Sequence, residues 1–585
     1  RPRPHRAPGR PRAGAGDRPP ANRLVAVLVA MVVGLLGVVA RLGVLQVRDA
    51  SSYRRLAVEQ RLRTLTLPAT RGAIFDRNGE ELALSLPAKA VFVDPQLVRD
   101  PEGESVVVAR ALGLPREEVY RAMTAPGRFV YLARQVDLAT ARRLERRRLP
   151  GVGFLDESRR HYPAGPLAPQ VLGFVGVDGV GLAGLELQYD RVLSGEPGRQ
   201  VLEVDPGGRF IPQGAHREVP PTPGEGILTT IDRDIQYAAQ RALARAVREN
   251  RARGGSVIVM VPSTGEVLAM ASYPWFDPER FEEAPPARQR NRAVTDAYEP
   301  GSVNKLVTVA AAIEEGVVKI NQRLMVPDHY PMYSKVFRDV YPHPTRPMTV
   351  ADIIAHSSNV GAIMLAERLG KERLSRYLSR FGLGRPTGVD FPGESPGIVP
   401  DPSEWSGTSM GTIPIGQGIA VTPLQMAAAY AAVANDGVWV QPRLVRAMVG
   451  RDGGLRPLPP PRTRQVVSER TARWLRRILA FAVEEGTGQR AQVPGYWVAG
   501  KTGTAKKPLP DGRGYGDRFV ASFIGFAPAA RPAVLVAAVL DEPVTVYGGV
   551  AAAPLFREVA RFALARLRVP PAPRPPDPPH AVPVG

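Results

Sequence analysis

Residues 299–305 read Glu-Pro-Gly-Ser-Val-Asn-Lys, and the largely apolar, alanine-rich run Leu306–Glu315 follows them. Pro-Gly before this run and Gly316 after it predict the two ends of a helix. Ser302 then lies in the first turn, with Lys305 three residues later on the same face. A serine nucleophile needs a nearby base, and a lysine desolvated at a helix N-terminus can lose its proton. The pair predicts serine nucleophilic chemistry, although SxxK alone is a weak pattern that two solvated side chains would also satisfy.

Two further motifs in the same half of the chain supply partners for this pair: Ser357-Ser-Asn359 and Lys501-Thr-Gly-Thr504. The first follows a short helix predicted by a Thr-x-x-Asp capping box at 349–352, and the second lies in a strand that ends at Ala505. A serine and an asparagine in a loop can relay a proton and hold an amide. A strand can align an extended peptide through main-chain hydrogen bonds, and Gly503 would leave room for it.

The elements around these motifs predict an α+β domain over residues 226–567. Helices are expected over 232–249 and 553–566, and strand patterns lie near both ends of the domain, at 256–261, 266–272, 496–505, 519–526 and 533–541. Strands at both ends with helices between them predict one antiparallel sheet flanked by helices, rather than alternating βαβ units. A capping box with proline at 422–425 opens another helix, which we interpret as structural.

Residues 48–225, before this domain, predict an extended, mixed α/β pedestal. A tight turn at Asp76-Arg-Asn-Gly79 separates two strands, a strand run lies at 90–93, and helical patterns cover 51–63 and 138–148. At the other end, residues 568–585 contain eight prolines and predict a disordered, Pro-rich tail.

The N-terminal sequence predicts one membrane anchor. Residues 1–23 carry seven arginines and one aspartate, whereas Leu24–Ala40 contains no charge. Because Arg41 can snorkel and apolar residues continue to Val47, residues 24–47 suffice for one tilted span. A cleaved signal peptide is the alternative, but the basic region is long and no small-x-small cleavage site follows the apolar run. The positive-inside rule places residues 1–23 in the cytoplasm and the folded chain outside the cell membrane.

The amino-acid composition argues against several kinds of binding site and cofactor. The net charge of +21 suits an anionic partner, but the arginines are scattered and form no recognised nucleic-acid motif, so we expect no nucleic-acid binding. The absence of cysteine excludes disulfides, thiolate nucleophiles and Cys-ligated zinc, and the seven histidines lack metal-ligand spacing. We therefore expect no metal and no other cofactor.

SxxK, SxN and KTG in this order resemble the motifs of the penicillin-binding proteins and serine β-lactamases. Three stretches are similar to class B penicillin-binding proteins in particular: Arg71–Gly79, Tyr298–Ser302 and Gly416–Gln425. Four others are most similar to the division and sporulation branch of that class, with the elongation branch as the alternative: Tyr162-Pro163, Gln170–Gly176, Gly184–Asp190 and Ser357–Gly361. The resemblance covers roughly residues 24 to 566 and implies a penicillin-binding transpeptidase fold.

The resemblance implies a peptidoglycan D,D-transpeptidase that cross-links stem peptides through an acyl-enzyme. Ser302 would attack the carbonyl of D-Ala-D-Ala, and Lys305 would accept its proton. Ser357 would help to protonate the departing D-Ala, and Asn359 would bind the amide of the acyl peptide. β-Lactam antibiotics would acylate the same serine.

The third motif would then bind substrate. Lys501 would serve the electrostatic network or the substrate carboxylate, Thr502 and Thr504 would bind that carboxylate, and the Thr504 and Ser302 N–H groups would form the oxyanion hole. No ATP is required, because one peptide bond is exchanged for another. Glycan polymerisation would fall to a partner of the SEDS-type glycosyltransferase class, alongside other division proteins.

Related activities stay open at this point. A serine β-lactamase would share the three motifs but would need neither an anchor nor the region 48–225. A D,D-carboxypeptidase differs only in using water as the acceptor, and a catalytically silent β-lactam-binding divisome scaffold would not need the motifs intact. One departure from the family pattern is Val303-Asn304 inside SxxK, which is expected to alter local packing rather than the chemistry.

Overall fold

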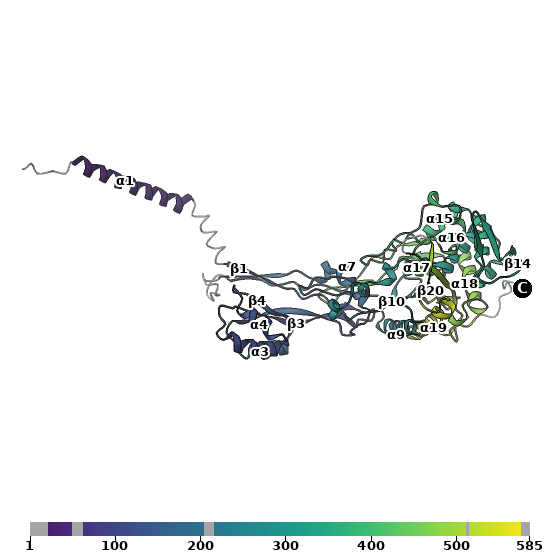
Figure 1. The fold of residues 1–585 in the computed structure, drawn as a ribbon, viewed down its shortest axis with the longest axis horizontal. Coiled ribbons are helices and arrows are strands. Elements are labelled where there is room, and N and C mark those ends of the chain that lie inside the picture. The colour runs from purple at the N-terminus through teal and green to yellow at the C-terminus, as the bar shows by residue number, and fades with distance from the viewer. Residues whose placement is uncertain (1–20, 49–61, 204–215, 510–513, 575–585) are drawn as a thin grey trace, which may run out of the picture. The chain divides into compact units, whose positions relative to one another are not determined.

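The structure, a computed structural model, describes residues 21–48, 62–203, 216–509 and 514–574 (Figure 1). Contacts within the chain divide it into two compact units. The smaller unit comprises Arg1–Leu67 and Pro197–Pro221. Its described parts are helix α1 (Ala21–Gly43), a π-helical turn (Val44–Arg48) and an antiparallel sheet in the order β1-β6-β7 (Leu62–Leu67, Gly198–Glu203, His216–Val219).

Helix α1 and its π-helical extension form one apolar segment where the anchor was predicted. Leu24–Arg48 is 25 residues long and apolar enough to cross a membrane, although a signal sequence would satisfy the same criteria. Its large apolar side chains are exposed rather than packed in a core. The helix predicted at 51–63 lies outside the described residues except for Leu62 and Arg63, which instead begin strand β1.

The larger unit, Pro68–Glu196 and Thr222–Gly585, contains a seven-stranded mixed sheet that joins the predicted pedestal to the later chain. The pedestal contributes β2 (Ile74–Phe75), β3 (Glu81–Val93), β4 (Val130–Asp137) and β5 (Val152–His161). The later chain contributes β8 (Gly226–Thr229), β16 (Val445–Val449) and β17 (Leu455–Pro457). Strands β2 and β8 pair in parallel, so backbone hydrogen bonds cross the predicted boundary at 225.

Arg71, which precedes β2 in the chain, belongs to a buried cluster of ion pairs with residues of the segment 160–190. The Glu186 side chain is fully buried, and its two oxygens accept from Arg71 Nε at 2.6 Å and Arg160 Nε at 2.7 Å. Arg71 also pairs with Asp190 at 2.6 Å. The short helices α7 (Gly184–Gln188) and α8 (Asp190–Leu193) carry Glu186 and Asp190, and the buried short helix α6 (Pro169–Leu172) precedes them in the chain.

Three helices form a small lobe on the pedestal strands: α3 (Pro101–Leu112), α4 (Arg116–Met123) and α5 (Leu138–Glu145). Their apolar faces meet β3 in a separate core that contains Val91, Val108 and Leu144. Helix α5 ends at Glu145, three residues before the predicted end.

The predicted antiparallel sheet is present in the order β10-β9-β21-β20-β19. Its strands are β9 (Gly254–Met260), β10 (Val267–Tyr273), β19 (Ala499–Pro508), β20 (Tyr515–Ala527) and β21 (Val534–Asp541). Helices α9 (Arg233–Glu249) and α19 (Gly548–Arg566) cover one face, where alternate residues such as Val257 and Val536 form a core with them. The opposite face packs on the helical half of the domain.

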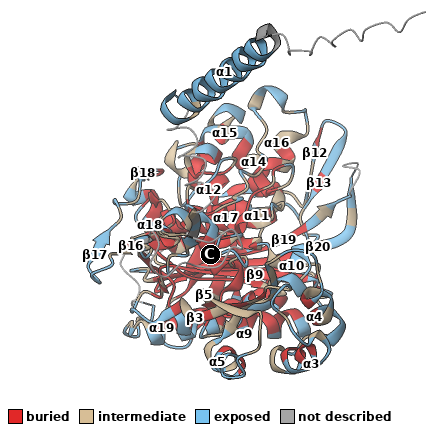
Figure 2. Cartoon of the chain, turned by 90° about the vertical axis from the view of Figure 1, so that its left-hand side faces the viewer, coloured by how far each residue is buried: buried red, intermediate tan, exposed pale blue. Residues whose placement is uncertain are grey.

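The helical half contains α17 (Pro423–Ala434), whose twelve residues are all buried and which packs on strands β9, β20 and β21. It also contains the heavily buried α12 (Lys305–Glu314), which packs on α14 (Asn359–Leu369) (Figure 2). Its longer helices are α12 (Lys305–Glu314), α13 (Val350–Ala355), α14 (Asn359–Leu369), α15 (Lys371–Arg380), α17 (Pro423–Ala434) and α18 (Glu469–Glu484). Short helices are α10 (Pro286–Gln289), α11 (Arg292–Thr295) and α16 (Ser409–Thr412), with 3-10 segments at Pro278–Glu283, Gly301–Asn304, Pro402–Glu404, Ile413–Ile415 and Gln489–Ala491. Three two-stranded ribbons complete it: β11 (Leu324–Val326) with β14 (Arg346–Met348), β12 (His329–Met332) with β13 (Lys335–Arg338), and β15 (Val438–Val440) with β18 (Thr463–Gln465).

The last helix differs from its predicted span. Helix α19 begins at Gly548 rather than at 553 and contains Pro554. A proline removes one intrahelical hydrogen bond, but burial of the first turns against the sheet outweighs that loss. After α19, Ala572 pairs with Tyr496, while residues 575–585 of the predicted tail lie outside the described residues.

Candidate active site

The turn that carries Ser302 packs closely against strand β19. Gly301–Asn304 is 3-10 helical and α12 follows directly, so the predicted first turn is tighter than an α-helix. Gly301 has φ +58°, and a Cβ there would lie 2.9 Å from the Thr504 carbonyl oxygen. Its N–H donates to the Gly416 carbonyl at 2.9 Å, and a Cβ on Gly416 would lie 2.1 Å from the Gly301 oxygen. These two glycines permit the close approach.

Side chains from the helical half fix the backbone of this turn. The buried Tyr430 hydroxyl of α17 donates to the Val303 carbonyl at 2.9 Å, and Asn304 Nδ2 donates to the Ile413 carbonyl at 2.9 Å. Asn304 is fully buried, and its Oδ1 has no hydrogen-bond partner among the described residues. The Val303 carbonyl and the Asn304 side chain therefore take part in the packing of this turn, and the expectation that this departure from the family pattern leaves the chemistry unaltered stays a prediction.

The structure brings the second motif to Lys305. Its Nζ lies 2.6 Å from the Ser357 carbonyl oxygen, 2.8 Å from Asn359 Oδ1 and 3.2 Å from Ser357 Oγ. A neutral amine can donate its two hydrogens to the carbonyl and amide oxygens, which only accept, and its lone pair is then left for a hydroxyl proton. No hydrogen bond joins Lys305 to Ser302 within the described chain, and such contacts tighten when substrate binds.

The environment of Lys305 favours this neutral form. The side chain is fully buried. Burial, and then the charge of Lys501, lower the pKa of Lys305 well below its ordinary value, although Asp339 opposes the shift. A lysine whose neutral form is favoured in this way can serve as a general base.

The SxN motif lies at the junction of α13 and α14. The predicted capping box at Thr349 starts α13, and Ser357 follows its end with φ +57°. Ser358 caps α14 by accepting the Gly361 N–H at 2.9 Å. Asn359 is the first residue of α14 rather than a loop residue, and its Nδ2 donates to the Arg338 carbonyl at 2.8 Å, which directs Oδ1 to the lysine.

Asp339, which sequence reasoning missed, holds this junction. Its Oδ1 accepts the N–H groups of Asn359 at 2.5 Å and Val360 at 3.0 Å, and its Oδ2 accepts from Ser358 Oγ at 2.7 Å. A carboxylate at the N-terminus of a helix is favoured by the free N–H groups and the helix dipole. Nothing in the sequence signals this contact, since the aspartate lies in a loop about twenty residues upstream.

The third motif lies on β19, an edge of the five-stranded sheet. Burial lowers the pKa of Lys501 to about 7, and its Nζ lies 3.1 Å from Thr502 Oγ1. The Thr502 hydroxyl also lies 2.7 Å from that of Thr487. Thr504 Oγ1 accepts the Gly548 N–H at 3.1 Å, where α19 begins.

Gly503 serves a purpose different from the one expected. A Cβ at this position would lie 2.2 Å from Ser522 Oγ and 3.0 Å from a Val303 methyl group. The space beside Gly503 is therefore filled by protein, and the glycine lets β19 pack against the Ser302 turn. Among the described strands β19 pairs only with β20, so its other side is free for an extended peptide.

Residues 255–561 match the penicillin binding protein transpeptidase domain, and residues 66–229 match the penicillin-binding protein dimerisation domain. The chain belongs to the class B penicillin-binding proteins. It is 37% identical over 594 residues to penicillin-binding protein PbpB of Mycolicibacterium smegmatis, an alignment that covers 95% of this chain and 91% of the relative. It is 35% identical over 527 residues to peptidoglycan D,D-transpeptidase FtsI of Escherichia coli, covering 87% and 86%.

Two further comparisons extend these relations among class B penicillin-binding proteins. The chain is 35% identical over 566 residues to stage V sporulation protein D of Bacillus subtilis, covering 94% of this chain and 86% of the relative. The crystal structure of penicillin-binding protein 3 from Mycobacterium tuberculosis, complexed with aztreonam, superposes with a TM-score of 0.69 at 34% identity, covering 87% and 98%. The predicted family, α+β transpeptidase fold and enzyme class are confirmed, whereas the domain boundaries and residue roles stay predictions.

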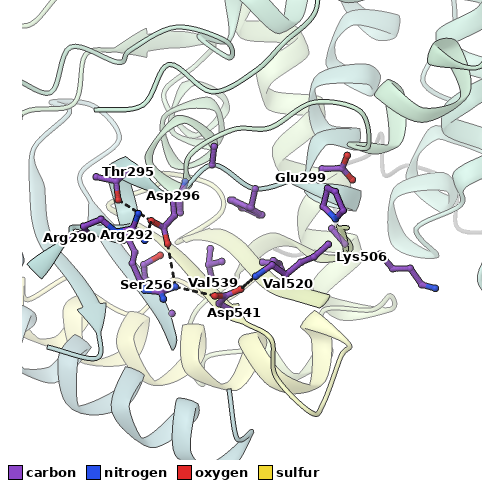
Figure 3. Close-up of a pocket in the computed structure, with 17 residues that line it drawn as sticks. Ser256, Arg290, Arg292, Thr295, Asp296, Glu299, Lys506, Val520, Val539 and Asp541 are labelled. Carbon is purple, nitrogen blue, oxygen red and sulfur yellow. Dashed lines mark hydrogen bonds and ion pairs between the residues drawn. The ribbon is translucent and has the colours of Figure 1, made fainter. Parts of the chain in front are cut away.

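Beside the motifs of this class B penicillin-binding protein lies a pocket of about 360 Å³. Figure 3 shows Arg292 and Asp296 on one side of it and Glu299 on the other. Burial raises the pKa of Glu299, whose Oε1 accepts from the Gly418 N–H at 2.8 Å and the Tyr515 hydroxyl at 3.1 Å. The pocket lies just beyond Thr504 along β19, with Ala505 to Pro508 in its wall, and charges of both signs line it.

Proposed function

We propose that this class B penicillin-binding protein is a peptidoglycan D,D-transpeptidase that forms an acyl-enzyme at Ser302. The observation that carries the proposal is the buried Lys305, held by Ser357 and Asn359 so that its lone pair is available, three residues after the serine. The transpeptidase domain is proposed to span 226–567, behind a pedestal of residues 48–225 and an anchor of residues 24–47.

In the proposed first half-reaction, Ser302 Oγ attacks the carbonyl carbon of the D-Ala-D-Ala peptide bond while its proton moves to Lys305. The Ser302 and Thr504 N–H groups stabilise the oxyanion. The C–N bond then breaks, and Ser357 delivers a proton from Lys305 to the departing D-Ala amine. The second half-reaction reverses these steps: an amine of a neighbouring stem peptide attacks the ester and restores the Ser302 hydroxyl.

Substrate alignment is assigned to β19 and the groups around it. The free edge of β19 offers main-chain hydrogen bonds to an extended stem peptide. Thr504 Oγ1 already accepts from Gly548, so its O–H is free to donate to the terminal carboxylate of the peptide. Lys501 supplies positive charge beside Thr502 and gains a proton more readily when that carboxylate binds. The rest of the donor peptide then extends past Ala505 toward the charged pocket.

The apolar N-terminal segment and the relatives support proposals for the membrane topology, the inhibitors and the cellular process. Residues 1–23 are proposed to be cytoplasmic and the catalytic domain extracytoplasmic. The Mycobacterium tuberculosis relative has been crystallised with aztreonam and with ampicillin, which supports covalent inhibition of this chain by β-lactams. The relative named stage V sporulation protein D supports a role in spore wall synthesis. A septal role, and a SEDS-type glycosyltransferase and other division proteins as partners, are proposed from the resemblance of the sequence motifs to the division and sporulation branch.

Labelling with fluorescent penicillin tests the acyl-enzyme. The wild type should carry a long-lived adduct on a denaturing gel, Ser302→Ala should carry none, and Ser403→Ala, an exposed serine outside the motifs, should label normally. Incubation with a donor peptide and an amine acceptor should release D-Ala and yield the cross-linked product. Hydrolysed donor alone would indicate a carboxypeptidase, and absence of an adduct on folded protein would refute the acylation mechanism in favour of a scaffold.

A further inference from the structure

His343 lies behind the SxN motif, in the segment that connects β13 to β14. Its Nε2 lies 3.0 Å from Asp339 Oδ2, and its Nδ1 lies 2.8 Å from the Pro344 carbonyl oxygen. The side chain is 11% exposed and that of Asp339 is 6% exposed, so water competes little for this contact.

Both ring nitrogens of His343 face groups that accept hydrogen bonds. The Pro344 carbonyl can only accept, and both oxygens of Asp339 already accept hydrogen bonds, from Asn359, Val360 and Ser358. A neutral imidazole has one N–H and would set a lone pair against one of these oxygens, whereas an imidazolium donates to both. The geometry therefore selects the doubly protonated ring.

Asp339 connects this ring to the catalytic base. The carboxylate fixes the N-terminus of α14, and α14 begins with Asn359, whose Oδ1 accepts from Lys305 at 2.8 Å. Ser357, which offers two oxygens to the same lysine, lies directly before the Ser358 that Asp339 holds. A change in the position or charge of Asp339 thus reaches both residues that orient the lysine.

We propose that His343 is a positioning residue of the transpeptidase site, whose protonated ring holds Asp339 and α14 in place, so that acylation slows as the ring loses its proton. The inference rests on the proposed function, since it concerns acylation at Ser302. Titration of His343 would change the acylation rate in the direction opposite to titration of Lys305. Lys305 must be neutral to serve as a base, so its protonation slows acylation at low pH.

The charges around His343 are consistent with this direction. Burial disfavours the charged ring and Arg346 repels it, but the hydrogen bonds to Asp339 and the Pro344 carbonyl prevail and raise the pKa of His343. Asp328, on the segment before β12, pairs chiefly with His329, whose hydrogen bond lowers the pKa of that carboxyl. A raised pKa in the folded state means that the protonated ring stabilises the fold at low pH, and this contribution is lost as pH rises through that value.

The test compares second-order rates of acylation by fluorescent penicillin between about pH 5 and 9 in the full-length protein and in His343→Gln. Glutamine can donate one hydrogen bond to Asp339 but does not titrate in this range. We expect an alkaline fall in rate in the wild type that is missing in His343→Gln, and a rate about tenfold lower in the variant at the acid end, as for loss of one charge-assisted hydrogen bond. Retention of the wild-type alkaline fall in His343→Gln would overturn the inference.

His329→Gln is the matched control. His329 also contacts a carboxylate, that of Asp328 at 2.7 Å, but its side chain is 57% exposed and this pair makes no described hydrogen bond to α14. The acylation rate of His329→Gln should still fall at alkaline pH. If this fall were lost in both variants, a specific role for His343 would be refuted. Hydrogen–deuterium exchange at the histidine rings measures the pKa of His343 in the wild type and needs no variant. This pKa must agree with the midpoint of the alkaline fall in acylation rate. If the wild type failed to label at all, the proposed function would be refuted. That outcome differs from normal labelling with an unchanged alkaline fall in His343→Gln, which would refute only the role of His343.

Discussion

Glu186→Gln should greatly destabilise the pedestal, because Glu186 lies between two buried arginines. The side chains of Arg71, Arg160 and Glu186 are 4%, 6% and 0% exposed. Glutamine keeps the shape but offers one acceptor oxygen, and its amide hydrogens then face one of the guanidinium groups. Arg71 would keep Asp190, whereas Arg160 has no other carboxylate within ion-pair distance among the described residues.

The expected loss follows from leaving the Arg160 guanidinium buried and unpaired. Removing one partner of a buried ion pair costs about 3–5 kcal/mol of unfolding free energy. Urea unfolding, followed by intrinsic fluorescence, measures the change. The matched control is Asp156→Asn, whose side chain is 91% exposed and pairs with Lys89 at 3.0 Å, and which should show no detectable change.

A double variant separates charge burial from loss of shape. Adding Arg160→Met to Glu186→Gln removes the orphaned cation, so part of the lost stability should return. Penicillin acylation by the folded fraction of each variant should equal that of the wild type, since no motif is altered. Equal unfolding midpoints for Glu186→Gln and Asp156→Asn would refute the reasoning.

Further predictions concern the Ser302 turn. Lys305→Met should slow penicillin acylation by about 10³-fold, and in the wild type acylation should slow on acidification as this lysine, whose pKa is held low, gains a proton. Gly416→Ala should slow acylation at least about tenfold, whereas Gly453→Ala, with the same φ of +79° but open space around it, should only lose stability, by about 1–2 kcal/mol. Tyr430→Phe leaves the Val303 carbonyl without its buried donor and should lower the unfolding free energy by about 1–2 kcal/mol, measured by urea unfolding.

Local signals in the sequence predicted the elements that carry the motifs. The capping boxes at Thr349 and Thr422 start α13 and α17 where expected, because a cap depends on residues three positions apart. The strands of the five-stranded sheet were also predicted, since their alternating or continuous apolar runs are local. The convergence of Ser357 and Asn359 on Lys305 followed from the family resemblance, not from periodicity.

Contacts between distant segments could not be predicted in this way. Asp339 contacts α14 through a loop conformation that no short-range pattern encodes. The Tyr430 hydroxyl donates to the Val303 carbonyl, which lies 127 residues earlier in the chain. The parallel pairing of β2 with β8 was missed for the same reason, because register between strands far apart depends on the whole fold. The start of α19 was predicted five residues too late, because burial of its first turns against the sheet depends on the tertiary fold.

The strands shared by the pedestal and the later chain have a mechanical consequence. A load applied to β3 or β4 passes through β2 into β8 along backbone hydrogen bonds, and β8 leads within a few residues into α9, which covers the catalytic sheet. Such a joint is stiff in shear and offers no swivel of the kind that a flexible linker would provide. Within the larger unit, a pull on the pedestal would therefore be transmitted as elastic strain of one continuous sheet rather than taken up by rotation.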